Sequence, residues 1–124
     1  MKTEVAAAIA LAGMLASGGA MADGNKLLEQ CQQAVRAMDN IPTPSIDLLG
    51  VGRCLGMVEG VRNTMVIFKS VLPDNMKVCF PKQGIDNGQA TRILEKFLHD
   101  NPAMLDQNDT FLTIVAFKQA YPCE

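Results

Sequence analysis

The chain has 124 residues, with 11 basic and 13 acidic side chains and a formal net charge of -2 at pH 7. It contains no basic run and no patch of interleaved basic and aromatic residues, which argues against nucleic acid and anionic membranes as partners. After residue 22 the length suits one small domain, and no apolar stretch there is long enough to cross a membrane.

Residues 1–22 have the pattern of a cleavable signal peptide. Lys2 supplies a positive charge, residues 5–15 are continuously apolar, and Ala20-Met21-Ala22 gives the small-x-small motif that precedes cleavage. This motif disfavours the alternative, a buried first helix of the mature domain. We therefore predict export, cleavage between Ala22 and Asp23, and a mature domain at residues 23–124.

All four cysteines lie in the predicted mature domain, at Cys31, Cys54, Cys79 and Cys123. An even number of cysteines in an exported chain predicts two disulfides. Zinc is the competing use, but the chain has no close CxxC or HxxxH pair. We expect no metal and no other cofactor.

The apolar residues recur at helical spacing in four segments, and no sustained alternation predicts a strand. The first predicted helix covers about Asn25–Met38 and ends before Pro42 and Pro44. The second begins at Thr43 or Ser45 as N-cap and runs to about Leu72.

After a connecting loop at residues 73–84, Asp86 is the predicted N-cap of the third helix, with Gln89 three residues later. This helix ends at Asn101-Pro102, and the fourth helix covers about Asp109–Ala120. The predicted fold is therefore all-α, a small disulfide-bonded bundle of about four helices.

Three glycines, Gly52, Gly56 and Gly60, form a stripe on the second predicted helix, away from its apolar stripe. Glycine is a poor helix former, so a helix that carries three in register needs a compensating contact. We expect this helix to be packed on both sides, with another helix approaching the glycines closely.

The helix order suggests the disulfide pairing, although sequence alone allows three connectivities. A short link should make the first two helices antiparallel neighbours, with Cys31 and Cys54 at similar distances from that link. Cys79 precedes the third helix and Cys123 follows the fourth, so a second hairpin would bring them together. We predict the pairs Cys31–Cys54 and Cys79–Cys123.

The side chains offer little for catalysis, and we predict that the protein is not an enzyme. The only histidine, His99, lies near a helix end and lacks a thiolate partner if the cysteines are oxidised. Ser45 and Ser70 lie in no nucleophile motif, and the glycines lack the context of a phosphate-binding loop. A protein of this kind acts by contact.

The most distinctive surface candidate is the connection His99–Asp109, with the sequence HDNPAMLDQND. One interpretation is a turn followed by a helix cap, with Met104 and Leu105 tucked into the core. The other is a protruding acidic loop with an apolar tip that could enter the cleft of a partner.

Four segments together resemble the Rap/Tai family of exported immunity proteins: GRCLGMVEG, KVCFP, ILEKFLHDNPAML and AFKQAYPC. No single segment is specific, but their order and spacing cover nearly all of the mature chain. The resemblance implies a helical periplasmic protein, often dimeric, that neutralises a papain-like Cys/His peptidoglycan amidase delivered by type VI secretion.

The resemblance implies inhibition by covering the toxin's active site, with contacts from the third helix and the following loop. The candidate contact residues there are Glu95, His99, Asp100, Asn101, Met104 and Asp106. Two alternatives stay open: a small periplasmic chaperone or envelope-stress protein, and a family member with another role in the envelope.

Overall fold

The structure is a computed structural model that describes residues 23–124, so the predicted signal peptide lies outside the described residues. The described part is built from helices and contains no strand, which confirms the all-α prediction. Its elements are α2 (Gly24–Met38), α3 (Leu48–Ile67), the 3-10 turn η2 (Asp74–Met76), α4 (Asn87–Asp100), the 3-10 turn η3 (Pro102–Met104) and α5 (Asp109–Ala120). None of these helices is both long and apolar enough to span a membrane.

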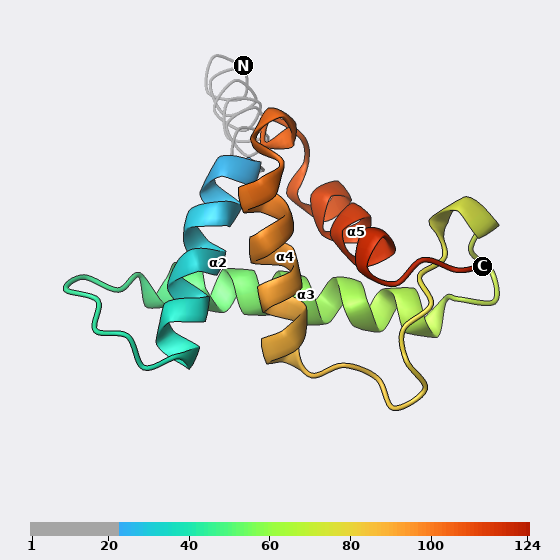
Figure 1. Cartoon of the computed structure of the whole chain (residues 1–124), viewed down its shortest axis with the longest axis horizontal. Helices are drawn as coiled ribbons and strands as arrows, with labels where there is room; N and C mark the ends of the chain where they lie inside the picture. The colour runs from blue at the N-terminus through green and yellow to red at the C-terminus, as the bar shows by residue number, and fades with distance from the viewer. Residues whose placement is uncertain (1–22) are drawn as a thin grey trace, which may run out of the picture.

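Three helices pack on one face of α3. Figure 1 shows α2 and α4 side by side, both crossing in front of α3, with α5 beyond α4. The buried residues of α3 recur every three or four positions, as expected for a helix with one covered face; they are Gly50, Cys54, Val58, Val61 and Met65. The core is completed by fully buried side chains from the other helices, including Leu27, Leu94, Leu98, Leu112 and Phe117.

Aspartate and asparagine side chains begin the four helices. The predicted cap of α4 is confirmed, because Asp86 Oδ1 accepts a hydrogen bond of 2.7 Å from the backbone N–H of Gln89. The predicted start of α3 is wrong: its cap is Asp47, whose carboxylate accepts from Gly50 N at 3.0 Å. The backbone N–H of Asp47 donates to Gln33 Oε1 at 2.7 Å, which fixes this residue against α2.

The end of α3 also differs from the prediction. The helix stops at Ile67, and residues 68–72 form a turn in which the N–H groups of Val71 and Leu72 both donate to the carbonyl of Phe68. This turn lets the chain bend before Pro73, which cannot continue a helix.

Both disulfides join the predicted cysteines, Cys31 with Cys54 and Cys79 with Cys123. The first pair forms in a helix arrangement that differs from the expected one: α2 crosses α3 and does not run antiparallel to it (Figure 1). Cys31 and Cys54 are each buried where the two helices meet.

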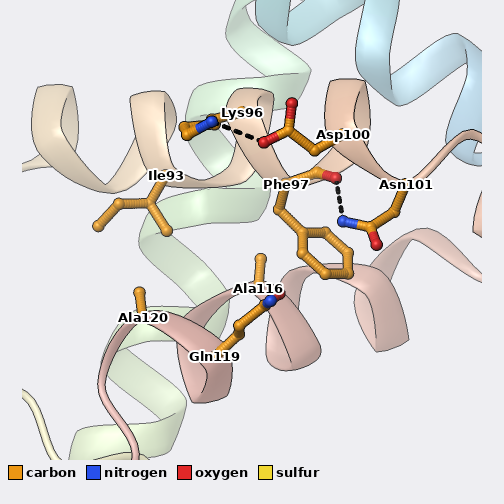
Figure 2. Close-up of a pocket in the computed structure, with 8 residues that line it drawn as sticks. All are labelled: Ile93, Lys96, Phe97, Asp100, Asn101, Ala116, Gln119 and Ala120. Atoms are coloured by element: carbon orange, nitrogen blue, oxygen red, sulfur yellow. Dashed lines mark hydrogen bonds and ion pairs between the residues drawn. The ribbon is translucent and has the colours of Figure 1, made fainter.

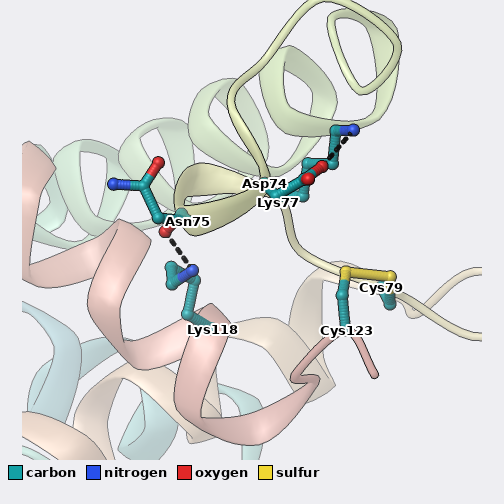
Figure 3. Close-up of a disulfide and its surroundings, with 6 residues drawn as sticks. All are labelled: Asp74, Asn75, Lys77, Cys79, Lys118 and Cys123. Carbon is teal, nitrogen blue, oxygen red and sulfur yellow. Dashed lines mark hydrogen bonds and ion pairs between the residues drawn. A yellow bond between two sulfur atoms is a disulfide. The ribbon is translucent and has the colours of Figure 1, made fainter.

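The second disulfide fastens the α3–α4 connection to the C-terminal end of the chain (Figure 3). Beside it, Cys79 N donates to the carbonyl of Tyr121 at 3.0 Å, and Lys118 Nζ donates to the carbonyl of Asn75. The ring of Phe80 packs against Phe117 and Tyr121, with 5.5 Å between ring centroids in both pairs. A segment without regular structure is thereby held on the core.

The glycine stripe does not pack as expected within the chain. A Cβ atom added at Gly52, Gly56 or Gly60 would meet no atom within 4 Å, so the prediction that another helix of this chain covers these glycines is wrong. The physical reason is that α2, α4 and α5 all use the opposite face of α3. Each glycine costs a helix about 0.8–1.0 kcal/mol relative to alanine, and no contact in the described chain offsets this.

Candidate partner-binding surface

The C-terminal half of α4 and the residue that caps it form a partly exposed ridge between two hollows. We define the α4 ridge as Glu95, Lys96, His99, Asp100 and Asn101. Glu95 and His99 are one helical turn apart and face α2, whereas Lys96 and Asp100 are one turn apart and face α5. Each pair lies on one side of the helix because residues four apart in an α-helix share a face.

The hollow on the α5 side is a groove of about 360 Å³ (Figure 2). Its α4 wall contains Ile93, Phe97 and the ridge residues Lys96, Asp100 and Asn101, and its α5 wall contains Ala116, Gln119 and Ala120. The two alanines lie one helical turn apart and leave room between the helices. Asn101 is held in place because its Nδ2 donates to the carbonyl of Phe97 at 2.7 Å.

The hollow on the α2 side measures about 300 Å³ and is more polar. Gln32, Val35 and Arg36 of α2 line it together with Glu95 and His99. At the far end of the same helix pair, Arg92 binds the carboxylate of Asp39 through two hydrogen bonds of 2.5 and 3.2 Å, which ties α4 to the end of α2. The helix that carries the ridge, α4, is therefore joined directly to α2.

The charges on the ridge are fixed by their neighbours. Lys96 Nζ donates to Asp100 at 2.6 Å, and His99 Nδ1 lies 3.3 Å from the same carboxylate. The hydrogen bond from Lys96, and after it the contact with His99, lowers the pKa of Asp100 below its ordinary value. The same hydrogen bond from Lys96 to Asp100 raises the pKa of Lys96. At neutral pH the ridge thus presents an ionised carboxylate beside an ammonium group.

The His99 side chain is 67% exposed, and its neighbour within hydrogen-bond range is a carboxylate; both cysteine pairs are oxidised. In residues 23–124 no three His, Cys, Asp or Glu side chains are grouped so that they could hold a metal ion. What the ridge offers is shape, charge and hydrogen-bonding groups.

The connection after α4 is a compact turn. Leu105 is buried and Met104 is half-buried against the core, so the interpretation of a helix-capping turn is confirmed and the apolar protruding tip is wrong. The N-terminus of α2 holds this turn: Asn25 Nδ2 donates to Leu105 O at 3.4 Å, and Gly24 leaves space for the Leu105 backbone.

The acidic residues of this connection do not act alike. Asp106 is exposed and accepts a hydrogen bond of 3.1 Å from Gln107. Asp109 is buried and forms an ion pair of 3.0 Å with Arg53, which links α5 to α3. Of the six predicted contact residues, the structure brings Glu95, His99, Asp100 and Asn101 together, turns Met104 inward and leaves Asp106 exposed on the neighbouring turn.

Two features of this surface were not predicted. One is Lys96, which sets the charge state of Asp100; its spacing of four from Asp100 is the signal that could have identified it. The other is the α5 wall of the groove, where Ala116 and Ala120 recur at helical spacing. Their meaning depends on knowing that α5 packs beside α4.

Comparison with known protein families identifies the family of this chain. The family model described as Rap1a immunity proteins matches residues 23–123, which is nearly the whole described domain. No curated protein and no solved structure is matched.

Proposed function

Because the chain belongs to the Rap1a immunity protein family, we propose that it is a periplasmic immunity protein that neutralises a peptidoglycan amidase delivered by type VI secretion. The observation that carries the proposal is the family match over residues 23–123. An immunity protein acts by binding an effector, so it needs no catalytic step of its own.

The α4 ridge is the surface that we propose for the effector. Its Lys96, His99 and Asp100 are exposed, its other two residues are half-buried, and it is flanked by hollows of about 360 and 300 Å³ that could receive side chains of a partner. Its charged groups can form charge-assisted hydrogen bonds, which are stronger than neutral ones. In a cysteine-dependent amidase, a ridge lodged in the active-site cleft would exclude the peptidoglycan substrate without chemical change.

The periplasmic location rests on two observations. The two disulfides are typical of an oxidising compartment, because cytosolic thiols are kept reduced. The family match begins at residue 23, the first residue after the predicted cleavage site. We propose accordingly that residues 1–22 direct export and are removed between Ala22 and Asp23.

Co-expression with an amidase effector exported to the periplasm tests this proposal. The amidase alone should lyse the cells, and the present chain should restore growth. Asp100→Lys, which reverses the ionised carboxylate on the ridge, should weaken protection, whereas Asp74→Lys should not. Asp74 is a matched control because its side chain is 97% exposed, it also pairs with a lysine, and it lies in the segment beside the Cys79–Cys123 disulfide and not on the ridge (Figure 3). The proposal would be overturned if the chain failed to relieve lysis by every amidase that is encoded beside its own gene.

A further inference from the structure

We propose that a hollow between the end of α3 and the α3–α4 connection binds an aliphatic carboxylate of the fatty-acid class, with about six to eight carbon atoms. The hollow has a volume of about 180 Å³. It lies on the segment that leads into α4, whereas the α4 ridge is at the other end of that helix. The inference goes beyond the proposed function and uses none of its observations, so the failure of either leaves the other standing.

One wall of the hollow comes from the end of α3. Val66 and Lys69 both line it. They are three residues apart, and residues at this spacing are neighbours on one side of a helix. Lys69 lies just after the helix ends, and its backbone N–H donates to the carbonyl of Val66 at 3.5 Å. This hydrogen bond keeps Lys69 beside Val66.

The opposite wall comes from the α3–α4 connection, which is held in place on both sides. The second disulfide joins it to the C-terminal end of the chain (Figure 3). The Arg62 guanidinium, from α3, donates to the carbonyl of Ile85 at 2.6 Å. Between these attachments, Gly84 N donates to the carbonyl of Pro81 at 2.8 Å and closes the turn that carries Lys82. The hollow is therefore formed before any ligand arrives.

The interior of the hollow is mainly apolar. Val78 is buried at 2% exposure, and Phe80 and Pro81 beside it are half-buried. The Phe80 ring is fixed against Phe117, with 5.5 Å between ring centroids. On the α3 side, 56% of Val66 is exposed to water. Covering this surface with an aliphatic chain is favourable, and since an apolar cavity of about 150 Å³ accepts benzene, the hollow can receive about six carbon atoms.

Two lysines give the hollow its preference for an anion. Lys69 and Lys82 line it from opposite walls, and both are exposed. Within residues 23–124 neither forms an ion pair, unlike Lys77 of the same connection, which binds Asp74. A carboxylate has two oxygens that can accept charge-assisted hydrogen bonds from two ammonium groups. A ligand that joins a short apolar chain to a carboxylate therefore matches the hollow in size and in charge.

Titration with sodium octanoate, followed by the amide NMR resonances of chain purified from the periplasm of an expression host, tests the proposal. We expect saturable binding in the millimolar range, with the largest shifts at residues 66–69 and 78–84. From butanoate to octanoate the affinity should rise about fourfold for each added methylene group, because each one buries apolar surface. Octanol has the same chain without the charge, and it should bind about tenfold more weakly.

Substitution of the two lysines tests which side chains hold the carboxylate. Lys69→Gln and Lys82→Gln should each weaken octanoate binding about threefold, and the double variant about tenfold. Lys26→Gln is the matched control, because it removes an exposed lysine of α2 that does not line the hollow, and it should bind octanoate like the parent. Circular dichroism checks that each variant is folded.

Three results would overturn the proposal. The first is octanoate binding that does not saturate, or that shifts resonances away from the hollow. The second is octanol binding as tight as that of octanoate. The third is a folded Lys69→Gln/Lys82→Gln variant that binds octanoate like the parent, since the two lysines would then have no part in recognising the ligand.

Discussion

Alanine substitution at two glycines compares a position that faces open space with a position that is closely packed. Gly56 lies in mid-helix on the open face of α3, where an added Cβ meets nothing. Gly24 begins α2, and a Cβ there would lie 2.5 Å from Leu112 Cδ1 and 2.7 Å from the carbonyl oxygen of Leu105. The same chemical change should therefore have opposite effects at the two positions.

The expected magnitudes follow from these surroundings. Gly56→Ala should raise the free energy of unfolding of the monomer by about 0.8–1.0 kcal/mol, the difference in helix propensity. In a domain of this size, that corresponds to a rise in melting temperature of about 4–8 °C. Gly24→Ala should lower the free energy of unfolding by about 1–3 kcal/mol, because the backbone at Leu105 cannot yield as easily as a flexible side chain.

Urea unfolding monitored by circular dichroism measures both effects, at protein concentrations low enough to keep the chain monomeric. Dilution matters because self-association, which the family resemblance implies, would add its own contribution to stability. A loss of stability in Gly56→Ala in the dilute monomer would refute the reasoning, since it would show that the glycine stripe is covered within the chain. Unchanged stability of Gly24→Ala would refute the close packing of α2 on the turn at Leu105.

Three further substitutions test the account of the fold. Replacing Cys31 and Cys54 together by alanine should cost about 3 kcal/mol of unfolding free energy, as expected for a loop closed over 23 residues; a loss below about 1 kcal/mol in urea unfolding would contradict this. Asp109→Ala should cost about 1–3 kcal/mol, because it removes the ion pair through which the buried Asp109 links α5 to α3, while Asp106→Ala on the exposed turn should stay within about 0.5 kcal/mol. The hydrogen bonds from Arg92 lower the pKa of Asp39 in the folded chain. The ionised carboxylate therefore stabilises the fold at a pH above its unfolded pKa of about 3.9. This contribution to stability is lost as the pH falls through the lower pKa of the folded state. Asp39→Asn should therefore reduce the drop in the urea midpoint between neutral pH and about pH 3; an identical drop in both proteins would argue against the Asp39–Arg92 pair.

The helices were predictable where local chemistry determines them. The capping carboxylate of Asp86 and the stop at Asn101-Pro102 act over a few residues, so α4 follows from its own sequence. The start of α3 was not predictable in the same way. Asp47 became its cap partly because Gln33, fourteen residues earlier on α2, binds the Asp47 backbone.

The surfaces depend even more on tertiary packing. The glycine stripe is evident in the sequence. Whether the stripe lies in the core or on the surface depends on which face of α3 the other helices pack against. Similarly, Asp100, Asp106 and Asp109 look alike in sequence. Only the position of Arg53 on α3 draws Asp109 inward and leaves the other two on the surface.

The central claim is that this chain covers the active site of an amidase effector, and the reactivity of the effector's catalytic cysteine tests it most directly. The measurement is the alkylation rate of that cysteine by iodoacetamide as the chain is titrated into the effector. Covering the active site predicts that the rate falls in proportion to complex formed, and that Asp100→Lys protects less than Asp74→Lys at equal concentration. An alkylation rate that stays unchanged while a complex forms would contradict the claim.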